Sequence, residues 1–438
     1  MQETPIQKLY EVFIKCGQQI CTDTRKLIPG SLFLCLKGAN FNANEFALKS
    51  LEGGCAFAVV DEEKYAVNQN TLYVKDVLLA LQALANFHRK QFKIPFIAIT
   101  GSNGKTTNKE LINAVLSKKY KTLATVGNLN NHLGVPFTLL SVTSEHEIAI
   151  IEMGANHQGE IDALCKIAEP DFGLITNIGK AHLEGFGGIE GVKNGKSEMY
   201  KHIASTGGKI FINGDDEVLK SLAVNNDKIF YGTQEKCDVI GKDVSDNEYV
   251  TFKWTTLNGE SDWNKISSVH TNIIGHYNFI NLLCAVTIGN YFNVSERQIN
   301  EALSEYKPNM NRSQLEKTAN NTLILDAYNA NPSSMNAAIE NFAELDASDK
   351  LLIVGDMFEL GEYANEEHKK IVELIEGRKI NHVILIGPEF CKAANNNFKT
   401  FTGTNEALEY LKQHPQKNKT ILIKGSRGMK LEILKDVL

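Results

Sequence analysis

The sequence lacks any cysteine pattern that would indicate a metal site or a disulfide framework. Its eight cysteines are scattered along the chain, with no C-x-x-C pair and no histidine-rich neighbourhood. Neither a zinc site nor a small disulfide-bonded scaffold is therefore indicated. We interpret these cysteines as small buried side chains in a protein that folds in a reducing compartment.

A surplus of basic charge and long apolar runs are absent as well. Lys and Arg number 46 against 52 Asp and Glu, a formal net charge of -6, whereas nucleic-acid-binding proteins usually carry a basic face. No apolar run approaches the ~20 residues that span a bilayer. The first residues, MQETPIQKLYEVF, do not form a signal-peptide pattern. We expect a cytoplasmic protein with no nucleic-acid partner and no stable membrane association.

What is present is an ordinary globular composition, 43% apolar and 22% charged. At ~150 residues per domain, the chain is long enough for about three domains. Its texture predicts them at residues 1–92, 93–307 and 308–438. The first mixes short β-like runs with a strong helical stretch over 77–92. The other two alternate strands, loops and helices, which is typical of an α/β fold with mostly parallel sheets.

Apolar runs locate the strands and helices of the second and third domains. The central domain opens with the buried strand KIPFIAITG, and EIAIIEMG and DFGLITNIG follow as further strands. Its predicted helices cover residues 108–119, 158–168 and 278–291, and a more polar stretch over 233–272 predicts peripheral β structure. In the last domain we predict strands at NTLILDAY, DKLLIVGD, HVILIGP and KTILIKG.

A glycine-rich turn follows the first strand of the central domain. It reads Gly101-Ser102-Asn103-Gly104-Lys105-Thr106-Thr107 and leads into a predicted helix. Backbone N–H groups in such a turn, together with the helix N-terminus, form an anion-binding nest. The lysine can reach the β- and γ-phosphates, and a following threonine hydroxyl can ligate Mg²⁺. The loop is shorter than G-x-x-x-x-G-K-[ST], because residue 99 is Ile. It predicts binding of ATP with Mg²⁺.

Two polar side chains stand at the ends of neighbouring predicted strands. Glu152 closes the strand IAIIE, and His182 follows the strand GLITNIG. Open parallel sheets bind ligands at the carboxyl edge of their strands, so both side chains can lie beside the glycine-rich turn. Their ordinary interpretations are a solvated charge and a structural histidine.

Several further motifs occur in a fixed order along the chain. After ITGSNGKTT come GNLNNHLGVPFTLL, EMGANHQGEI, TNIGKAHLEGFG, GKSE, GHYNFINLLCA, a lone Arg312, LDAYNANPSSM, GDMFELG and KGSRGMKLE, and TDTRKLIPGSLFLCLKG precedes them. This order resembles the Mur ligase family over nearly the whole chain. GANH-x-GEI and AHLEGFG favour the members that join D-alanyl-D-alanine to UDP-N-acetylmuramoyl-tripeptide.

The resemblance implies a fold and a reaction. An N-terminal α/β domain would bind the UDP end of the substrate, a central mononucleotide-binding domain would carry ATP, and a C-terminal Rossmann-like domain would close the site. ATP would phosphorylate the terminal carboxylate of the tripeptide, and the amine of D-alanyl-D-alanine would then displace phosphate. The products would be UDP-N-acetylmuramoyl-pentapeptide, ADP and phosphate, made by a monomer in peptidoglycan synthesis.

The resemblance also implies roles for residues at the reaction centre. The implied catalytic residues are Lys105, Glu152, His182, Lys196 and Arg312. Thr106 and Glu152 would hold one magnesium ion, and His182 a second ion nearer the acyl phosphate. Lys196 matches a lysine that is carbamylated in several members and would then be a metal ligand. The alternative is an unmodified lysine that binds phosphate or is solvated.

ATP would contact residues outside the glycine-rich turn. Asn278 and Asn281 match amides that can read the adenine edge. Arg312 matches an arginine that reaches the γ-phosphate, a planar donor suited to a phosphoryl group. Asp326 would contact ribose or the water around the metal. Because Arg312 and Asp326 belong to the third domain, catalysis should require domain closure.

Substrate-binding residues are implied in four groups. They are Asp23, Thr24 and Arg25; Asn130, Asn131 and His132; Asn156 and His157; and Tyr328, Asn329 and Asn331. The first group matches a D-[ST]-R motif near the uridine and diphosphate. The second faces the nucleotide and the acceptor carboxylate, the third matches the approach of the peptide end, and the fourth shapes the site around residue 326. The KGSR segment over 424–427 matches another family signature, with domain anchoring or helix capping as its ordinary interpretation.

Two features depart from the family's usual pattern. Leu325 precedes Asp326 where members often have an acidic pair, and NANEF over 42–46 replaces a D-G-H-x-F signature. The second departure affects expected substrate contacts of the N-terminal domain and leaves the nucleotide site untouched.

Two alternatives to this reaction remain open. Another amide ligase of the superfamily could add meso-diaminopimelate or lysine to a UDP-muramoyl dipeptide, or glutamate to a folate, although no D-N-P-R acceptor motif is present. A nucleotide-dependent binding protein without ligase activity is the second, and the retained Lys105, Glu152, His182 and Lys196 argue against it. The third residue of the tripeptide can be lysine or meso-diaminopimelate.

Overall fold

A computed structural model of the chain describes residues 2–223, 225–246, 248–308, 314–347, 349–378 and 380–438. It divides into two compact units. The first contains Met1–Ala98, Tyr120–Gly154 and Glu160–Phe172, and the second contains Ile99–Lys119, Ala155–Gly159 and Gly173–Leu438. Among the helices of the described ranges, none has both the length and the apolar character needed to cross a membrane.

The N-terminal part of the first unit contains a small parallel sheet with the strand order β1-β2-β5-β6. The elements are α1 (Ile6–Lys15), β1 (Ile20–Cys21), β2 (Leu32–Leu34), β3 (Lys37–Gly38), β4 (Phe41–Asn42), α2 (Ala47–Glu52), β5 (Phe57–Val60), β6 (Thr71–Tyr73) and α3 (Val77–Arg89). Strands β3 and β4 pair as a separate hairpin. Helix α3 confirms the predicted helix and ends three residues before the predicted residue 92. Helix α1 was not predicted, although its buried Leu9, Val12 and Phe13 have helical spacing.

The largest sheet has nine strands in the order β15-β14-β13-β12-β11-β10-β7-β9-β8. They are β7 (Phe96–Thr100), β8 (Thr122–Ala124), β9 (Ile148–Glu152), β10 (Phe172–Ile175), β11 (Lys209–Asn213), β12 (Asp227–Gly232), β13 (Val239–Asp243), β14 (Tyr249–Thr256) and β15 (Val269–Ile274). Every residue of β7 and β9 is buried, as expected for parallel strands covered on both faces. The antiparallel strands β14 and β15 confirm the predicted peripheral β structure.

Helices α4 to α11 belong to the same region of the chain. They are α4 (Lys105–Leu116), α5 (Gly134–Leu140), α6 (Glu160–Ala168), α7 (Leu183–Phe186), α8 (Ile189–Thr206), α9 (Glu217–Leu222), α10 (Phe279–Tyr291) and α11 (Glu296–Glu305). Helix α4 begins three residues before the predicted residue 108, because Lys105 and the two threonines after it form its first turn. Helix α10 packs against α4 and so brings residues near 280 to the glycine-rich turn.

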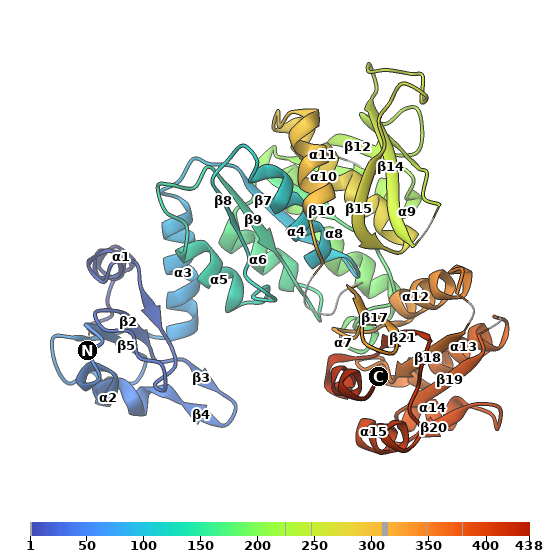
Figure 1. Ribbon diagram of the computed structural model, residues 1–438. Helices are drawn as coiled ribbons and strands as arrows, with labels where there is room; N and C mark the ends of the chain where they lie inside the picture. The colour runs from blue at the N-terminus through green and yellow to red at the C-terminus, as the bar shows by residue number, and fades with distance from the viewer. Residues whose placement is uncertain (1, 224, 247, 309–313, 348, 379) are drawn as a thin grey trace. The chain divides into compact units, whose positions relative to one another are not determined.

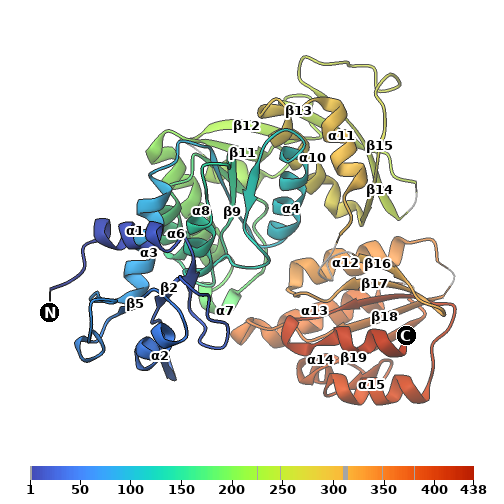
Figure 2. The same ribbon diagram turned by 60° about the vertical axis from the view of Figure 1, so that its left-hand side comes forward.

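The C-terminal sheet has the strand order β16-β17-β21-β18-β19-β20. Its elements are β16 (Gln314–Lys317), β17 (Thr322–Asp326), α12 (Pro332–Glu344), β18 (Lys350–Gly355), α13 (Ala364–Glu376), β19 (His382–Ile386), α14 (Pro388–Ala393), β20 (Lys399–Phe401), α15 (Thr404–Gln413) and β21 (Thr420–Lys424). The four predicted strands are confirmed, whereas the short edge strands β16 and β20 were not predicted. Figure 1 and Figure 2 show helices on both faces of this sheet, and its inner strands pair in parallel. Parallel pairs also predominate in the nine-stranded sheet, so the α/β fold is as expected.

Short 3₁₀ turns complete the described secondary structure. They are η1 (Ala43–Phe46), η2 (Glu63–Tyr65), η3 (His276–Asn278), η4 (Gly361–Tyr363), η5 (Arg427–Met429) and η6 (Leu431–Val437). Seven of the eight cysteines are buried and Cys391 is half-buried, which fits their interpretation as small core side chains.

Candidate active site

The glycine-rich turn connects β7 to α4 through two glycines in conformations that other residues rarely adopt. Gly101 has a φ of +143°, and a Cβ there would lie 1.9 Å from Thr176 Oγ1. Gly104 has a φ of +77°, and its Cβ would lie 3.0 Å from Asn281 Oδ1. Both positions therefore require glycine, one for the close approach of Thr176 and the other for its left-handed backbone.

Residues that follow β10 hold the turn in place. Ser102 Oγ donates to the carbonyl oxygen of Gly179 over 3.0 Å, and the Gly179 N–H donates back to Ser102 Oγ over 2.8 Å. The Asn103 N–H donates to Asn177 Oδ1, and the Asn103 carbonyl oxygen accepts from Thr176 Oγ1 and Asn177 Nδ2. The turn is thus shaped by its neighbours. Asn177 was not predicted as a site residue, although it lies in the motif after β10.

Lys105 is folded back over the turn. Its ammonium group donates to the carbonyl oxygens of Gly101 at 2.7 Å and of Ser102 at 3.3 Å. Thr106, the next residue of α4, is only 3% exposed. The lysine thus lies over the nest, and a phosphate oxygen would bind it more strongly than these neutral carbonyl oxygens do.

A chain of amide side chains connects α10 to the turn. Asn278 Nδ2 donates to the carbonyl oxygen of Ile274, and Asn278 Oδ1 accepts from Asn281 Nδ2 at 2.8 Å. Asn281 Oδ1 accepts from Asn108 Nδ2 at 2.7 Å, and the same Nδ2 reaches the Gly104 carbonyl oxygen at 2.9 Å. The structure therefore brings both predicted adenine-reading residues to the glycine-rich turn. Asn108 was missed, and its spacing of four residues from Gly104 in a helix was the available signal.

Glu152 lies at the end of β9 and is 1% exposed. Its N–H donates to Thr125 Oγ1, and its Oε1 accepts from Asn130 Nδ2 at 2.7 Å. The Asn130 carbonyl oxygen in turn accepts from the Gly154 N–H. Asn130, a predicted substrate residue, thus orients the carboxylate of Glu152. Because this carboxylate is buried and hydrogen-bonded, Glu152 is not the solvated surface charge that was its alternative interpretation.

The other two residues of that predicted group have different surroundings. Asn131 Oδ1 accepts from the N–H groups of Leu133 and Gly134 at the start of α5. The His132 side chain is exposed, and its carbonyl oxygen accepts from Gln82 Nε2. Asn131 therefore has a structural role in this loop.

His182 precedes α7 and lies against the side chain of Glu359 from the loop after β18. His182 Nδ1 lies 2.6 Å from Glu359 Oε2. This contact lowers the pKa of the Glu359 carboxyl below its ordinary value, against the opposing effect of burial. Glu359 was not predicted to have a role, because nothing in the order of motifs along the chain links it to His182.

Lys196 lies on α8 and is 1% exposed. Its Nζ donates to the Ala155 carbonyl oxygen over 3.2 Å and lies 5.0 Å from the centre of the Phe186 ring. The solvated lysine considered from the sequence is therefore wrong. Asn156 and His157, which directly follow Ala155, are exposed. They lie against α7, because a Cβ on Gly185 would be 2.3 Å from the Asn156 carbonyl oxygen.

The predicted C-terminal residues lie at the carboxyl ends of β17 and β21. Asp326 Oδ2 is 2.5 Å from Nζ of the buried Lys424. Asn331 caps α12 through Ser334 and donates from Nδ2 to Asn103 Oδ1 of the glycine-rich turn, over 2.6 Å. Arg312 lies outside the described residues. The C-terminal region therefore contacts the turn directly, through a residue that the sequence assigned to substrate binding.

Tyr328 and Asn329 follow Asp326 in the chain, at the carboxyl end of β17. The Arg427 guanidinium lies 5.4 Å from the centre of the Tyr328 ring, and Asn329 is exposed. Within the KGSR segment, the buried Ser426 Oγ accepts from the Phe358 N–H over 2.8 Å. This contact supports the anchoring interpretation of the segment.

Comparison of the sequence and the structure with known proteins identifies the family of this chain. Residues 99–289 match the Mur ligase middle domain, and residues 311–427 match the Mur ligase, glutamate ligase domain. The UDP-N-acetylmuramoyl-tripeptide–D-alanyl-D-alanine ligase of Bacillus subtilis is 36% identical over 96% of this chain and 93% of its own. This chain belongs to the Mur ligase family.

Other members agree in sequence and in structure. The enzyme of the same name from Escherichia coli is 34% identical over 94% of this chain and 92% of its own. A crystal structure of MurF from Acinetobacter baumannii superimposes with a TM-score of 0.86 at 33% identity, covering 95% of this chain and 92% of that one. The predicted family and fold are thus confirmed.

In this Mur ligase, the N-terminal motif residues form a local ion pair. Arg25 Nε and Nη2 contact the two oxygens of Asp23 at 2.9 and 2.8 Å. Hydrogen bonds from Arg25 lower the pKa of the Asp23 carboxyl to about 2. Thr24 between them is half-buried. Arg25 is exposed, so its guanidinium can still be approached from solvent.

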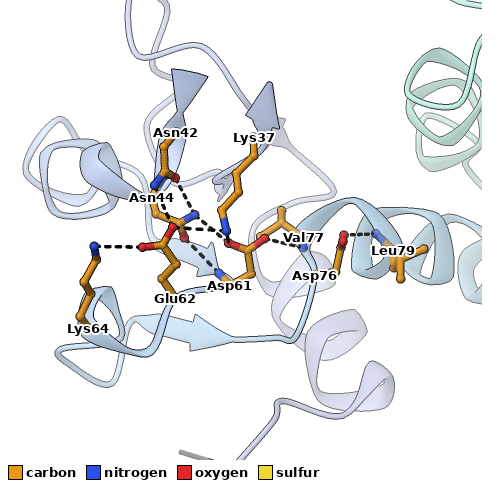
Figure 3. Close-up of polar contacts among 9 residues, drawn as sticks. All are labelled: Lys37, Asn42, Asn44, Asp61, Glu62, Lys64, Asp76, Val77 and Leu79. Atoms are coloured by element: carbon orange, nitrogen blue, oxygen red, sulfur yellow. Dashed lines mark hydrogen bonds and ion pairs between the residues drawn. The ribbon is translucent and has the colours of Figure 1, made fainter. Parts of the chain in front are cut away.

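The NANEF departure from the family pattern builds a closed polar network (Figure 3). Asn42 Oδ1 accepts from Asn44, and Asn42 Nδ2 donates to Glu62 at 2.8 Å. The fully buried Asn44 donates from Nδ2 to Asp61 Oδ1 and accepts from the Asp61 N–H. Lys37 Nζ pairs with Asp61 at 2.8 Å. The segment therefore has a structural explanation that does not require a substrate.

The predicted site residues are divided between the two compact units. The first unit contains Asp23, Thr24, Arg25, Asn130, Asn131, His132 and Glu152, and the second contains Gly101 to Thr107, Asn156, His157, His182, Lys196, Asn278, Asn281, Asp326, Tyr328, Asn329 and Asn331. Within the second unit, the turn, the amides of α10 and the cap of α12 are joined by hydrogen bonds. In the strand order, β7 lies between β9 and β10.

Proposed function

We propose that this Mur ligase uses ATP to join D-alanyl-D-alanine to UDP-N-acetylmuramoyl-tripeptide. The observation that carries the proposal is the match over 96% of the chain, at 36% identity, to the Bacillus subtilis enzyme of that name. The products are UDP-N-acetylmuramoyl-pentapeptide, ADP and phosphate. The reaction belongs to peptidoglycan synthesis and takes place in the cytoplasm. The enzyme acts as a monomer without nucleic-acid or membrane partners.

The three predicted domains divide this work. Residues 1–92 bind the UDP end of the substrate, with Asp23, Thr24 and Arg25 near the uridine and diphosphate. Residues 93–307 bind ATP, and residues 308–438 complete the site. The hydrogen bond from Asn331 to Asn103 supports a direct role for the C-terminal region at the nucleotide.

The glycine-rich turn binds the triphosphate. Its backbone N–H groups and the N-terminus of α4 attract the phosphates, and Lys105 exchanges its carbonyl partners for phosphate oxygens. Asn278 and Asn281 read the adenine edge, Asp326 lies near the ribose, and Arg312 reaches the γ-phosphate. The amide chain through Asn108 supports this arrangement, since it ties both asparagines to the turn.

Magnesium fits the donors that are present. Among the described residues, no group of three or more His, Cys, Asp and Glu forms a ready-made metal cage. Mg²⁺ instead binds through one or two protein oxygens together with substrate phosphates and water. The buried Glu152 carboxylate and the Thr106 hydroxyl supply such oxygens, His182 serves a second ion, and Lys196 adds a ligand if it is carbamylated. The ion would neutralise phosphate charge as the carboxylate approaches.

The chemistry proceeds in two substitutions. The terminal carboxylate of the tripeptide attacks the γ-phosphorus, ADP leaves, and an acyl phosphate forms. The amine of D-alanyl-D-alanine then attacks the acyl carbon, an amide bond forms, phosphate leaves and the amine loses a proton. In this proposal Asn156 and His157 approach the peptide end, Asn130, Asn131 and His132 face the nucleotide and the acceptor carboxylate, and Tyr328, Asn329 and Asn331 shape the site around Asp326.

Product analysis tests this function. We expect the protein, ATP and Mg²⁺ to convert UDP-N-acetylmuramoyl-tripeptide and D-alanyl-D-alanine to a pentapeptide of the expected mass, with one phosphate released per product. A panel of tripeptides would show whether lysine or meso-diaminopimelate is preferred at the third position. Phosphate release without need for the dipeptide, or no pentapeptide from any tripeptide, would overturn the proposal.

A further inference from the structure

Two loops of the second unit meet at His182 and Glu359. The β10 loop, residues 176–182, follows β10, and the β18 loop, residues 356–360, follows β18. His182 Nδ1 lies 2.6 Å from Glu359 Oε2. The Glu359 carbonyl oxygen also accepts from the N–H of Glu184 over 3.2 Å. Two contacts therefore join Glu359 to the end of the β10 loop.

Both residues of this contact have a left-handed backbone. His182 has a φ of 54° and Glu359 a φ of 62°, two of the seven non-glycine residues with positive φ in the described ranges. This conformation costs roughly 1–2 kcal/mol for a residue with a side chain. Such strain persists where the surroundings fix it, and it gathers at functional sites. The side chains of two strained residues contact each other here. We infer that the fold maintains this geometry because it has a function.

The chemistry of histidine suggests the purpose. A carboxylate beside Nδ1 holds the proton on that nitrogen, so that Nε2 keeps its lone pair. A histidine that ligates a metal typically gives its other N–H to a carboxylate, which fixes the tautomer and the ring orientation. The 2.6 Å separation of Nδ1 from Glu359 Oε2 is consistent with this pairing, which would leave Nε2 as the nitrogen that can bind a cation.

We propose that Glu359 is a positioning residue that orients the His182 imidazole for a divalent cation. This inference rests on the proposed function, in which His182 serves a second magnesium ion. It adds a residue from the β18 loop, which the C-terminal region supplies. The site at His182 would then be complete only when the β18 loop lies against the β10 loop.

A simpler role for Glu359 is to fasten the two regions together. The β10 loop carries another such fastening close by, at Lys180. Its Nζ pairs with the buried Glu367 at 2.7 Å, and its N–H donates to Ser333 Oγ at 3.0 Å. These contacts do not involve His182. A Lys180 variant therefore loosens the same two regions without touching the imidazole, and it is a matched control.

The experiment measures cation binding directly. Mn²⁺ binding to the full-length protein with a non-hydrolysable ATP analogue is followed by electron paramagnetic resonance for wild type, His182→Ala, Glu359→Ala, Glu359→Gln, Lys180→Met and Glu362→Gln. His182→Ala identifies the site that depends on the histidine. We expect Glu359→Ala to weaken that site by about 10-fold to 100-fold, and Glu359→Gln, which keeps an acceptor oxygen, to weaken it less.

The controls separate positioning from fastening. We expect Lys180→Met and the exposed Glu362→Gln to leave Mn²⁺ affinity within about twofold of wild type. Equal loss of affinity in Lys180→Met and Glu359→Ala would overturn the proposal in favour of fastening. Unchanged affinity in Glu359→Ala would also overturn it.

A second measurement does not need the metal. In ¹⁵N spectra of protein labelled at histidine, with His182 assigned from its alanine variant, we expect a protonated Nδ1 and an unprotonated Nε2. Glu359→Ala should lose this preference, and a wild-type ring protonated at Nε2 alone would contradict the proposal. The pentapeptide assay is run in parallel, so a failure of the ligase assignment is seen separately from a failure of the Glu359 inference.

Discussion

The glycine-rich turn and the N-terminal hairpin network use the same residue types for different ends. In the turn, Lys105 donates to backbone carbonyl oxygens. In the hairpin, Lys37 pairs with the carboxylates of Asp61 and Glu62 at 2.8 and 3.3 Å. Lys105 lies over the anion-binding nest of the turn, whereas Lys37 lies between two carboxylates that neutralise its charge. The turn therefore places a cation beside backbone N–H groups that can bind an anion, and the ion pairs of the hairpin network are made within the structure itself.

Asparagine shows the same contrast. Asn108 and Asn281 form a hydrogen-bonded link from helix α10 to the glycine-rich turn, where Asn108 Nδ2 also contacts the Gly104 carbonyl oxygen. Asn44 is fully buried, and its amide is spent on Asn42 and Asp61 (Figure 3). Residue type alone does not show which asparagine can bind a ligand, whereas the hydrogen-bond partners of each amide do show it.

The largest expected effect is on the lysine of the turn. Lys105→Met keeps the length of the side chain and removes its charge. Removing a group that stabilises charge in the transition state typically reduces kcat by about 10²-fold to 10³-fold, so we expect at least that loss in pentapeptide formation. Steady-state kinetics with mass detection measures it, and circular dichroism checks the fold. Activity within about tenfold of wild type would contradict the role of the turn, since a 1.4 kcal/mol change gives that factor.

The backbone of the turn gives the second prediction. Gly104→Ala forces a side chain into a left-handed residue whose Cβ would lie 3.0 Å from Asn281 Oδ1. We expect a cost of about 1–2 kcal/mol and ATP affinity lower by roughly tenfold, measured by calorimetry. Gly17→Ala is the matched control, because Gly17 has a φ of +64° and open space around it. Equal ATP affinity in the two variants would contradict the prediction that the backbone conformation at Gly104 is needed for ATP binding.

Sequence patterns predicted the turn, the main strands and the family, because these depend on residues that are close together in the chain. The short edge strands β16 and β20 escaped, since a strand of three or four residues has too few positions for a periodic signal. Asn108 is near the turn in sequence and Asn177 lies within the motif after β10, so both could have been found. Glu359 could not, because its partner His182 is in another motif and only the fold brings the two loops together.

The N-terminal network gives the third prediction, which concerns stability more than catalysis. Asn44→Leu leaves Asp61 without two of its hydrogen bonds in a buried setting. A buried polar group without its partner costs about 1–3 kcal/mol, so we expect a loss of that size in unfolding free energy, measured in urea. The affinity for ATP should be unchanged. Asn40→Ala in the exposed turn of the same hairpin is the control, with an expected change below about 0.5 kcal/mol. A large loss of ATP affinity in Asn44→Leu would show that the network is not purely structural.

The smallest expected effect is a pH effect at Asp23. Hydrogen bonds from Arg25 lower the pKa of its carboxyl to about 2, below the usual value of about 3.9. A carboxyl with a lowered folded-state pKa contributes stability above its unfolded pKa, and the contribution is lost as the pH falls from about 3.9 toward about 2. Carbon-13 NMR of protein labelled at aspartate measures the titration. Arg25→Met should move the pKa of Asp23 back toward the usual value, whereas Lys26→Met, a weaker and more distant charge, should move it less. If Asp23 titrates near the usual pKa in the wild type, Arg25 does not form a stable ion pair with this carboxylate. The Arg25 guanidinium would then be available to bind an anionic ligand, as we propose for Lys105 in the glycine-rich turn.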